Sequence, residues 1–280
     1  MKWVAGVLVY TLAAMSALAS ADSAAVHVSR GDARLAAGDF DEAIREYREA
    51  VRLNPHNAEE HFDLGMALKQ KGELDEAISE YREAIRLEPD LAEAHANIGS
   101  ILQMKGDLDR AMAEYREAIR LKPNLAFAHA DLGSALRVKR NLDAAIPELR
   151  TAVRLDPGLA EAHRDLGFAL GLKRDVDGAI TELREAVRLK PTLLEAHLGL
   201  GNALQLKGKL DDAIAEYREG VRLNPQYGTA HYDLASALFM KGDKSEAEKE
   251  MAEAERLDPK IKPPVQLARP GQSRPVVRGQ

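Results

Sequence analysis

The chain has 280 residues, and it contains no cysteine, 5% aromatic residues and 30% charged residues. The lack of cysteine excludes disulfide bonds, thiolate metal ligands and cysteine nucleophiles. The formal net charge of −6 argues against nucleic-acid binding, because a phosphate backbone requires a basic surface. Few aromatic residues together with abundant Ala and Leu favour helices that pack through aliphatic side chains.

Residues 1–21 differ in composition from the rest of the chain. Lys2 precedes an uncharged and mostly apolar stretch, and the residues from Ala17 to Ala21 match the small-x-small pattern of a cleavage site. This segment predicts a signal peptide and therefore an exported protein, either periplasmic or secreted. The alternative is an uncleaved N-terminal anchor, although the apolar stretch is short for a membrane span of about 20 residues. Beyond such an anchor we expect no contact with a membrane.

The region from residue 24 to residue 261 is built from copies of a 34-residue repeat. The string LDEAISEYREAIRLEP at 74–89 returns as LDRAMAEYREAIRLKP at 108–123 and as LDDAIAEYREGVRLNP at 210–225. Numbered within a copy, position 8 is Gly in six copies, while position 20 is Ala and position 32 is Pro in every copy. A period of this length predicts a stack of identical supersecondary units. Seven copies fit the frame, starting at residues 24, 58, 92, 126, 160, 194 and 228.

This spacing of Gly, Ala, an aromatic residue and Pro resembles the tetratricopeptide repeat (TPR). The resemblance implies an all-α fold, a right-handed TPR superhelix (α-solenoid) of about seven helix-turn-helix repeats that occupies residues 22–261. It also implies a scaffold that binds other proteins. Some copies are similar to the repeats attached to protein O-GlcNAc transferases, but the sequence contains no segment that resembles their catalytic domain.

Local signals predict where the two helices of each copy begin and end. Gly at position 15 suits the left-handed residue that ends the first helix, and Arg140 and Arg174 replace it in two copies. Asp at position 18, as in Asp75 and Asp143, is expected to cap the second helix. Glu at position 26 and Arg at position 29 predict weak surface ion pairs one turn apart.

A histidine occupies position 4 of every copy. Histidine is a common metal ligand, but the axes of packed helices lie about 8–10 Å apart, whereas zinc ligands lie about 2.1 Å from the metal. We therefore predict that these side chains pack between the helices of each repeat, with no metal site and no cofactor. A weak pH-sensing role is the alternative. The seven are His27, His61, His95, His129, His163, His197 and His231.

A second set of side chains occupies positions 2, 5, 6, 9, 12 and 13, which we call the first-helix face. The family resemblance implies that this face lines a concave groove. Three basic residues lie among its acids: Lys69, Arg137 and Arg164. The candidate partner-binding residues are the polar Asp63, Asn97, Asp131, Asp165 and Asp233, the hydrogen-bonding Ser100, Ser134 and Asn202, and the apolar Phe62 and Phe127.

The kind of partner that we predict follows from the acidic residues at position 6. In repeats that resemble those of O-GlcNAc transferases, Asn at this position grips the backbone of an extended peptide, whereas four copies here carry Asp. We therefore expect an extended, basic or donor-rich segment of another protein. The family's carboxylate clamp for an acidic C-terminus requires Lys at position 5, which is absent from every copy. The alternative is that these acidic residues have no role in binding and only keep the helices soluble.

Catalytic motifs are missing from the sequence. It contains no HExxH, no GxSxG and no nucleotide-binding loop after a strand, so we expect no enzymatic activity. The alternative function is that of an accessory subunit that presents substrates to an enzyme complex, such as a glycosyltransferase or a secretion or envelope-assembly system. Residues 262–280 contain four prolines, four basic residues and no acid, which predicts a disordered tail that could compete for the acidic groove.

Overall fold

The computed structural model describes residues 23–261, and every regular element among them is a helix. This confirms the predicted all-α solenoid of helix-turn-helix repeats. The predicted signal peptide (residues 1–21) and the predicted tail (residues 262–280) lie outside the described residues. Among the residues that are described, no helix combines the length and apolar character needed to cross a membrane.

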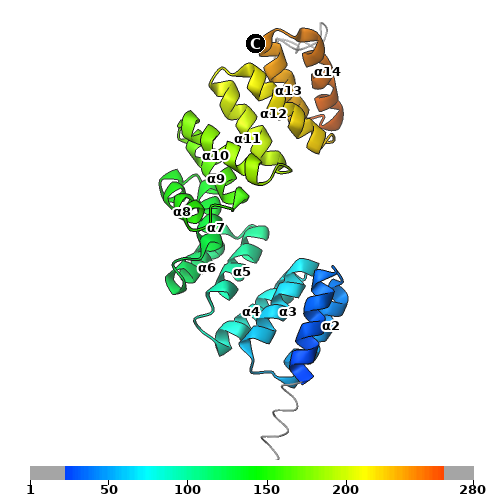
Figure 1. Ribbon diagram of the computed structural model, residues 1–280, viewed down its shortest axis with the longest axis vertical. Coiled ribbons are helices and arrows are strands. Elements are labelled where there is room, and N and C mark those ends of the chain that lie inside the picture. Colours follow the sequence, from blue (N-terminus) through cyan, green and yellow to red (C-terminus); the bar gives the residue numbers. More distant parts are fainter. Residues whose placement is uncertain (1–22, 262–280) are drawn as a thin grey trace, which may run out of the picture. The chain divides into compact units, whose positions relative to one another are not determined.

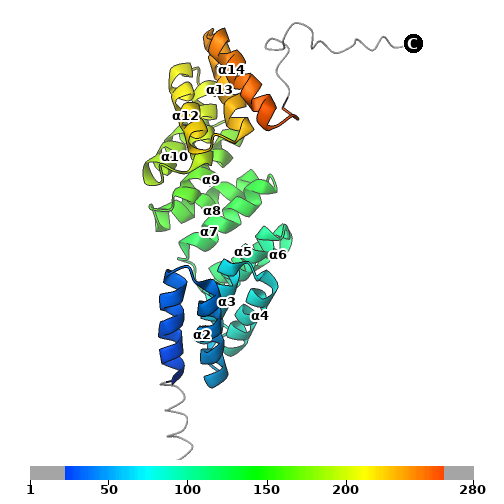
Figure 2. The ribbon, with the colours of Figure 1, turned by 90° about the vertical axis from the view of Figure 1, so that its right-hand side faces the viewer.

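Each copy of the repeat forms two helices that lie side by side, as the pairs α3–α4 and α13–α14 show (Figures 1 and 2). The chain forms two compact units that divide after Ala135, within α7 (Ala126–Val138). The first unit contains the helical residues 23–36, α2 (Phe40–Leu53), α3 (Ala58–Lys71), α4 (Leu74–Leu87), α5 (Ala92–Met104) and α6 (Leu108–Leu121). The second contains α8 (Leu142–Leu155), α9 (Ala160–Leu172), α10 (Val176–Leu189), α11 (Leu194–Leu206), α12 (Leu210–Leu223), α13 (Gly228–Lys241) and α14 (Lys244–Leu257).

The two helices of a repeat pack closely because a glycine of the first helix leaves room for a large side chain of the second. A Cβ atom added to Gly99 would lie 2.7 Å from the Tyr115 ring, which is closer than van der Waals contact allows. Tyr115 is 1% exposed, so its ring fills the space that the glycine leaves open. In the last repeat Ala235 stands at the glycine position, and there the more flexible Met251 replaces the tyrosine.

The helix termini follow the predicted pattern in part. Arg140 and Arg174 adopt the left-handed conformation, with φ of 63° and 67°, where the other described repeats have glycine. The predicted cap at position 18 is wrong, because the N-cap lies two residues earlier, at position 16. Asp39 and Asp107, for example, accept hydrogen bonds from the backbone N–H groups of Glu42 and Arg110.

The aspartates at position 18 instead join neighbouring repeats. Asp75 accepts a hydrogen bond from Lys105 of the next repeat at 2.5 Å, and Asp143 accepts one from Lys173 at 2.7 Å, both across 30 residues. Because these side chains are exposed, each pair stabilises the stack only weakly. The predicted pairs between positions 26 and 29 are confirmed in Glu83–Arg86, Glu117–Arg120, Glu185–Arg188, Glu219–Arg222 and Glu253–Arg256.

Candidate partner-binding face

The position-4 histidines lie inside the scaffold, as predicted. In the repeat of α9 and α10, His163 Nδ1 lies 2.7 Å from a carboxylate oxygen of Glu182, and Nε2 lies 3.2 Å from the carbonyl oxygen of Pro157. His197 makes the same two contacts, with Glu216 and Pro191. Each ring therefore connects the second helix of its own repeat to the end of the preceding repeat. The described residues contain no group of side chains arranged to hold a metal ion.

Both ring nitrogens of these histidines face acceptors, which favours the doubly protonated imidazolium. The hydrogen bond to Glu182 raises the pKa of His163 above 6.5 against the opposing effect of burial. The hydrogen bond to Glu216 does the same for His197. At His163 and His197 the charged imidazolium is therefore favoured, and each ring links two elements of the scaffold.

The position-6 side chains, by contrast, lie in different environments, which position 12 of the preceding repeat determines. Where position 12 is basic, it reaches the position-6 side chain 28 residues later. Lys69 Nζ donates to Asn97 Oδ1 at 2.9 Å, and Arg137 Nη2 donates to Asp165 Oδ1 at 3.2 Å. Asp165 also accepts a hydrogen bond from Arg164 at 3.1 Å and is only 4% exposed. Its carboxylate therefore orients two arginines and is not open to a partner.

Asp63, in the first unit, has no such partner. Position 12 of the preceding repeat is Leu35, and the Asp63 carboxyl makes no hydrogen bond or ion pair within the described residues. Burial, together with the nearby charges of Asp32, Glu59 and Glu60, raises the pKa of Asp63 to about 7. A half-buried carboxyl in this state gains from any donor or cation that reaches it.

A second unsatisfied group lies near Asp63. The buried hydroxyl of Tyr81 has no hydrogen-bond partner among residues 23–261. Burial raises the pKa of Tyr81, and the charge of Asp63 adds to this effect. Other repeats supply an acceptor from position 9 or 12, as when Tyr47 donates to Asp32 at 2.7 Å and Tyr115 donates to Gln103 at 3.1 Å. The corresponding residues of the second repeat, Met66 and Lys69, offer no comparable acceptor.

Asp233, in the second unit, resembles Asp63. Gln205 holds position 12 of the preceding repeat, but its side chain bonds to Tyr217 and Met240. Asp233 makes no hydrogen bond or ion pair within the described residues, and burial raises its pKa to about 6. Among the described residues, no side chain satisfies the half-buried carboxyls of Asp63 and Asp233 in the predicted acidic ladder.

The remaining predicted residues divide between the two units. In the first unit, Asp131 supports the protonated form of Lys69, whose pKa burial lowers. Phe62 packs against Tyr81 with ring centroids 5.5 Å apart, and Phe127 is 38% exposed. Ser100 and Ser134 are half-buried on the same helical positions of their repeats. In the second unit Asn202 is exposed, and its Oδ1 accepts a hydrogen bond from the hydroxyl of Tyr217 at 2.8 Å.

A row of exposed aliphatic side chains at position 13 was missed by the sequence reasoning. In the second unit these are Val138, Leu172, Leu206 and Met240, with exposed fractions between 44% and 65%. A comparison of position 13 across the seven copies would have identified these residues, because five consecutive copies carry Met, Val or Leu there. Asp32, which adds to the charge around Asp63, was also missed.

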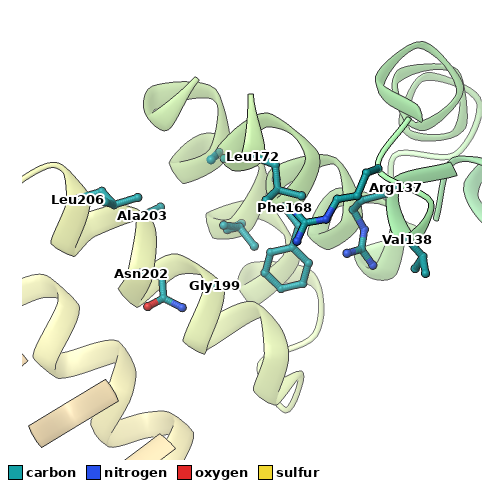
Figure 3. A pocket seen from close by; sticks show the side chains of 13 residues that line it. Arg137, Val138, Phe168, Leu172, Gly199, Asn202, Ala203 and Leu206 are labelled. Atoms are coloured by element: carbon teal, nitrogen blue, oxygen red, sulfur yellow. The ribbon is translucent and has the colours of Figure 1, made fainter. Parts of the chain in front are cut away.

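The second unit contains a surface pocket of about 480 Å³, with walls formed by residues of α7, α9, α10 and α11 (Figure 3). The Arg137 guanidinium carbon lies 5.5 Å from the centroid of the Phe168 ring in this pocket. The pocket results from three departures from the repeat pattern, namely Phe168 at position 9, Gly171 at position 12 and Gly199 at position 6. A Cβ atom on Gly199 would lie 2.3 Å from the Phe168 ring, so only glycine leaves room for the ring there.

These stacked helix pairs define the class of helix-turn-helix repeat proteins. The tetratricopeptide repeat family model matches residues 28–92, 62–126, 130–193 and 195–260. The chain belongs to the tetratricopeptide repeat family. No curated protein sequence matches the chain.

Solved structures share this fold. The chain is similar to one in the APC/C hetero-tetramer Cut9–Hcn1, with a TM-score of 0.70 and 19% identity over 80% of this chain and 44% of that one. It thus spans less than half of that larger chain. It is also similar to MamA, with a TM-score of 0.53 and 29% identity over 58% of this chain and 95% of that one. YrrB, a TPR protein with an unusual peptide-binding site, gives a TM-score of 0.53 and 21% identity over 66% of this chain and 95% of that one.

Proposed function

We propose that the protein is a non-catalytic scaffold whose first-helix face, in the first unit, binds an extended basic or donor-rich segment of another protein. The observation that carries the proposal is the half-buried carboxyl of Asp63, which has no partner among the described residues and a pKa raised to about 7. A lysine, arginine or backbone N–H group of a bound segment would supply the missing donor.

The surroundings of Asp63 also select against acidic partners. Asp32 and Glu59 add negative charge at this site. A second carboxylate would be repelled there, whereas a cation would be attracted during the encounter. The tetratricopeptide repeat fold supports a protein partner in general terms, and YrrB is a member of the same fold with a peptide-binding site.

The test compares two synthetic dodecapeptides of equal length, one of alternating Arg and Ser and the other of alternating Glu and Ser. Fluorescence anisotropy of the labelled peptides with the full chain at pH 8 measures their dissociation constants. We expect the basic peptide to bind and Asp63→Asn to weaken its binding about tenfold, which corresponds to the loss of one charge-assisted hydrogen bond. Equal binding of both peptides would contradict the proposal.

A matched control separates a specific contact from overall charge. Asp90 is exposed in a turn of the same unit, so Asp90→Asn removes one negative charge away from the first-helix face. We expect this variant to bind the basic peptide like the wild type. An equal loss with both variants would show that the peptide responds only to net charge.

We propose further that the protein is exported, on the evidence of the sequence of residues 1–21 alone. N-terminal sequencing of the protein recovered from the envelope fraction of an expressing bacterium tests this. A mature N-terminus near Ala21 supports cleavage and export, and an intact N-terminus in the cytoplasmic fraction contradicts it.

A further inference from the structure

The pocket of the second unit is an apolar cavity that opens to solvent at its rim. Val138, Leu172 and Leu206 form its rim and are 53%, 44% and 65% exposed. Exposed aliphatic side chains that cluster around a cavity mark a binding surface more often than scattered ones do. The volume of about 480 Å³ is sufficient for a large apolar side chain together with part of its backbone.

Within the described residues, the polar side-chain groups of the pocket that make no hydrogen bond are donors. Asn202 Oδ1 accepts a hydrogen bond from the Tyr217 hydroxyl, whereas its Nδ2 amide makes none within the described residues. Figure 3 shows this amide nitrogen on the side that faces the Phe168 ring. Arg137 bonds Asp165 through Nη2, and its side chain is still 22% exposed. A ligand that matches these groups must therefore carry acceptors.

The charge of the pocket points to the same ligand. Its lining contains Arg137 and Arg140 and no acidic residue. Acids do lie near Arg164, outside the lining, but Asp165 is shared between two arginines and Glu161 accepts a hydrogen bond from Lys190 at 2.7 Å. The pocket is thus a cationic and apolar site within an acidic protein, opposite in sign to the surroundings of Asp63.

We propose that this pocket binds an acidic–apolar segment of a partner protein, in which a large apolar side chain stands next to Asp or Glu. The apolar side chain packs against Phe168, Leu172 and Leu206. The neighbouring carboxylate accepts hydrogen bonds from Arg137 and from the Asn202 amide. The inference goes beyond the proposed function, because it concerns another site with the opposite preference of charge and does not depend on Asp63.

The repeats of this chain suggest variants that close or neutralise the pocket without disturbing the helices. A Cβ atom on Gly171 would meet nothing nearer than the Ala179 Cβ at 3.8 Å, so Gly171→Met places its side chain in the cavity. Arg137→Gln introduces the residue that Gln103 and Gln205 provide at position 12. Phe168→Ser introduces the residue found at position 9 in three other copies.

The experiment selects binders of the full chain from a library of random dodecapeptides displayed between constant segments. We expect enriched peptides to carry Asp or Glu next to Phe, Leu or Met. Gly171→Met and Arg137→Gln should each weaken their binding about tenfold or more, and circular dichroism verifies the fold. If Gly171→Met does not fold, Phe168→Ser takes its place. The control is Ala215→Met, which adds the same side chain to an exposed site of α12.

Three results would overturn the inference: no enriched peptide, enriched peptides without the acidic–apolar pair, or binding that the pocket variants leave unchanged. The selection also separates this site from the first unit. Peptides that bind at Asp63 should be basic and sensitive to Asp63→Asn. Peptides that bind in the pocket should be insensitive to Asp63→Asn. The failure of one proposal can therefore be told apart from the failure of the other.

Discussion

Residues of the same type at the same repeat position have different roles, because their neighbours differ. Asp63 and Asp165 both hold position 6, yet Asp63 has no partner in the part of the chain that the structure describes, whereas Asp165 is held by Arg137 and Arg164. The difference arises 28 residues upstream, where position 12 is Leu35 in one case and Arg137 in the other. The charge that a repeat offers is therefore a property of two adjacent repeats.

The raised pKa of Asp63 predicts a pH dependence of stability. Its folded pKa of about 7 lies above the ordinary value of 3.8, so between these values the folded protein retains a proton that the unfolded chain releases. The free energy of unfolding therefore falls as pH rises through this window. We expect Asp63→Asn to raise it by about 1–2 kcal/mol at pH 8, after allowance for solvent screening, and to change it little at pH 4. Urea unfolding at both pH values measures this difference, and an equal effect at both would contradict it.

His163 gives a second pH dependence of the same sign. The folded pKa of His163 lies above 6.5, so its stabilising contribution is complete below that value and is lost as pH rises through the folded pKa. We expect Glu182→Gln to lower the pKa of His163, because the hydrogen bond from Glu182 is the largest cause of the shift. NMR titration of the imidazole resonances measures it, with His197 as an internal reference that should not move.

At the scale of helices, the repeat frame made most of the fold predictable. The interhelical position of the histidines and the place of the left-handed residue at position 15 followed from the repeat spacing, but the sequence did not predict that Arg140 and Arg174 adopt this conformation without glycine. The helix cap did not follow from the spacing, because Asp at position 16 and Asp at position 18 both suit a helix N-terminus. Only the structure shows that position 18 contacts the lysine of the next repeat, as in Asp143 and Lys173.

The close contact between Gly99 and Tyr115 gives a prediction at the same scale. Gly99→Ala places a Cβ atom 2.7 Å from the Tyr115 ring and 3.1 Å from the carbonyl oxygen of Ala111. We expect this overpacking to lower the free energy of unfolding by about 1–3 kcal/mol. In the last repeat Ala235 stands at the glycine position and Met251 at the tyrosine position, which indicates that a methionine there accommodates the alanine.

A double-mutant cycle provides the measurement. Gly99→Ala and Tyr115→Met should together cost less than the sum of the two single changes, because the flexible methionine accommodates the added methyl group. Tyr115→Met alone should cost stability through the lost volume and the lost hydrogen bond to Gln103. Additive costs would show that the glycine and the ring do not constrain each other.

At the scale of the whole molecule, the acidic groove expected from the repeated aspartates becomes one of two kinds of site that we propose. The surroundings of Asp63 in the first unit favour cations, and the pocket around Arg137 and Phe168 in the second unit favours anions. Sequence reasoning found the first because the acids follow the repeat. It missed the second because the pocket depends on departures from the repeat, with Gly171 and Gly199 leaving space that a consensus side chain would fill.

The pH dependence of basic-peptide binding tests most directly whether Asp63 is the recognition residue. With a pKa of about 7, the Asp63 carboxyl is mostly protonated at pH 6 and mostly ionised at pH 8. The affinity of the alternating Arg–Ser peptide, measured by anisotropy at constant ionic strength, should therefore rise over this interval in the wild type and stay level in Asp63→Asn. A rise of the same size in both proteins would contradict the account.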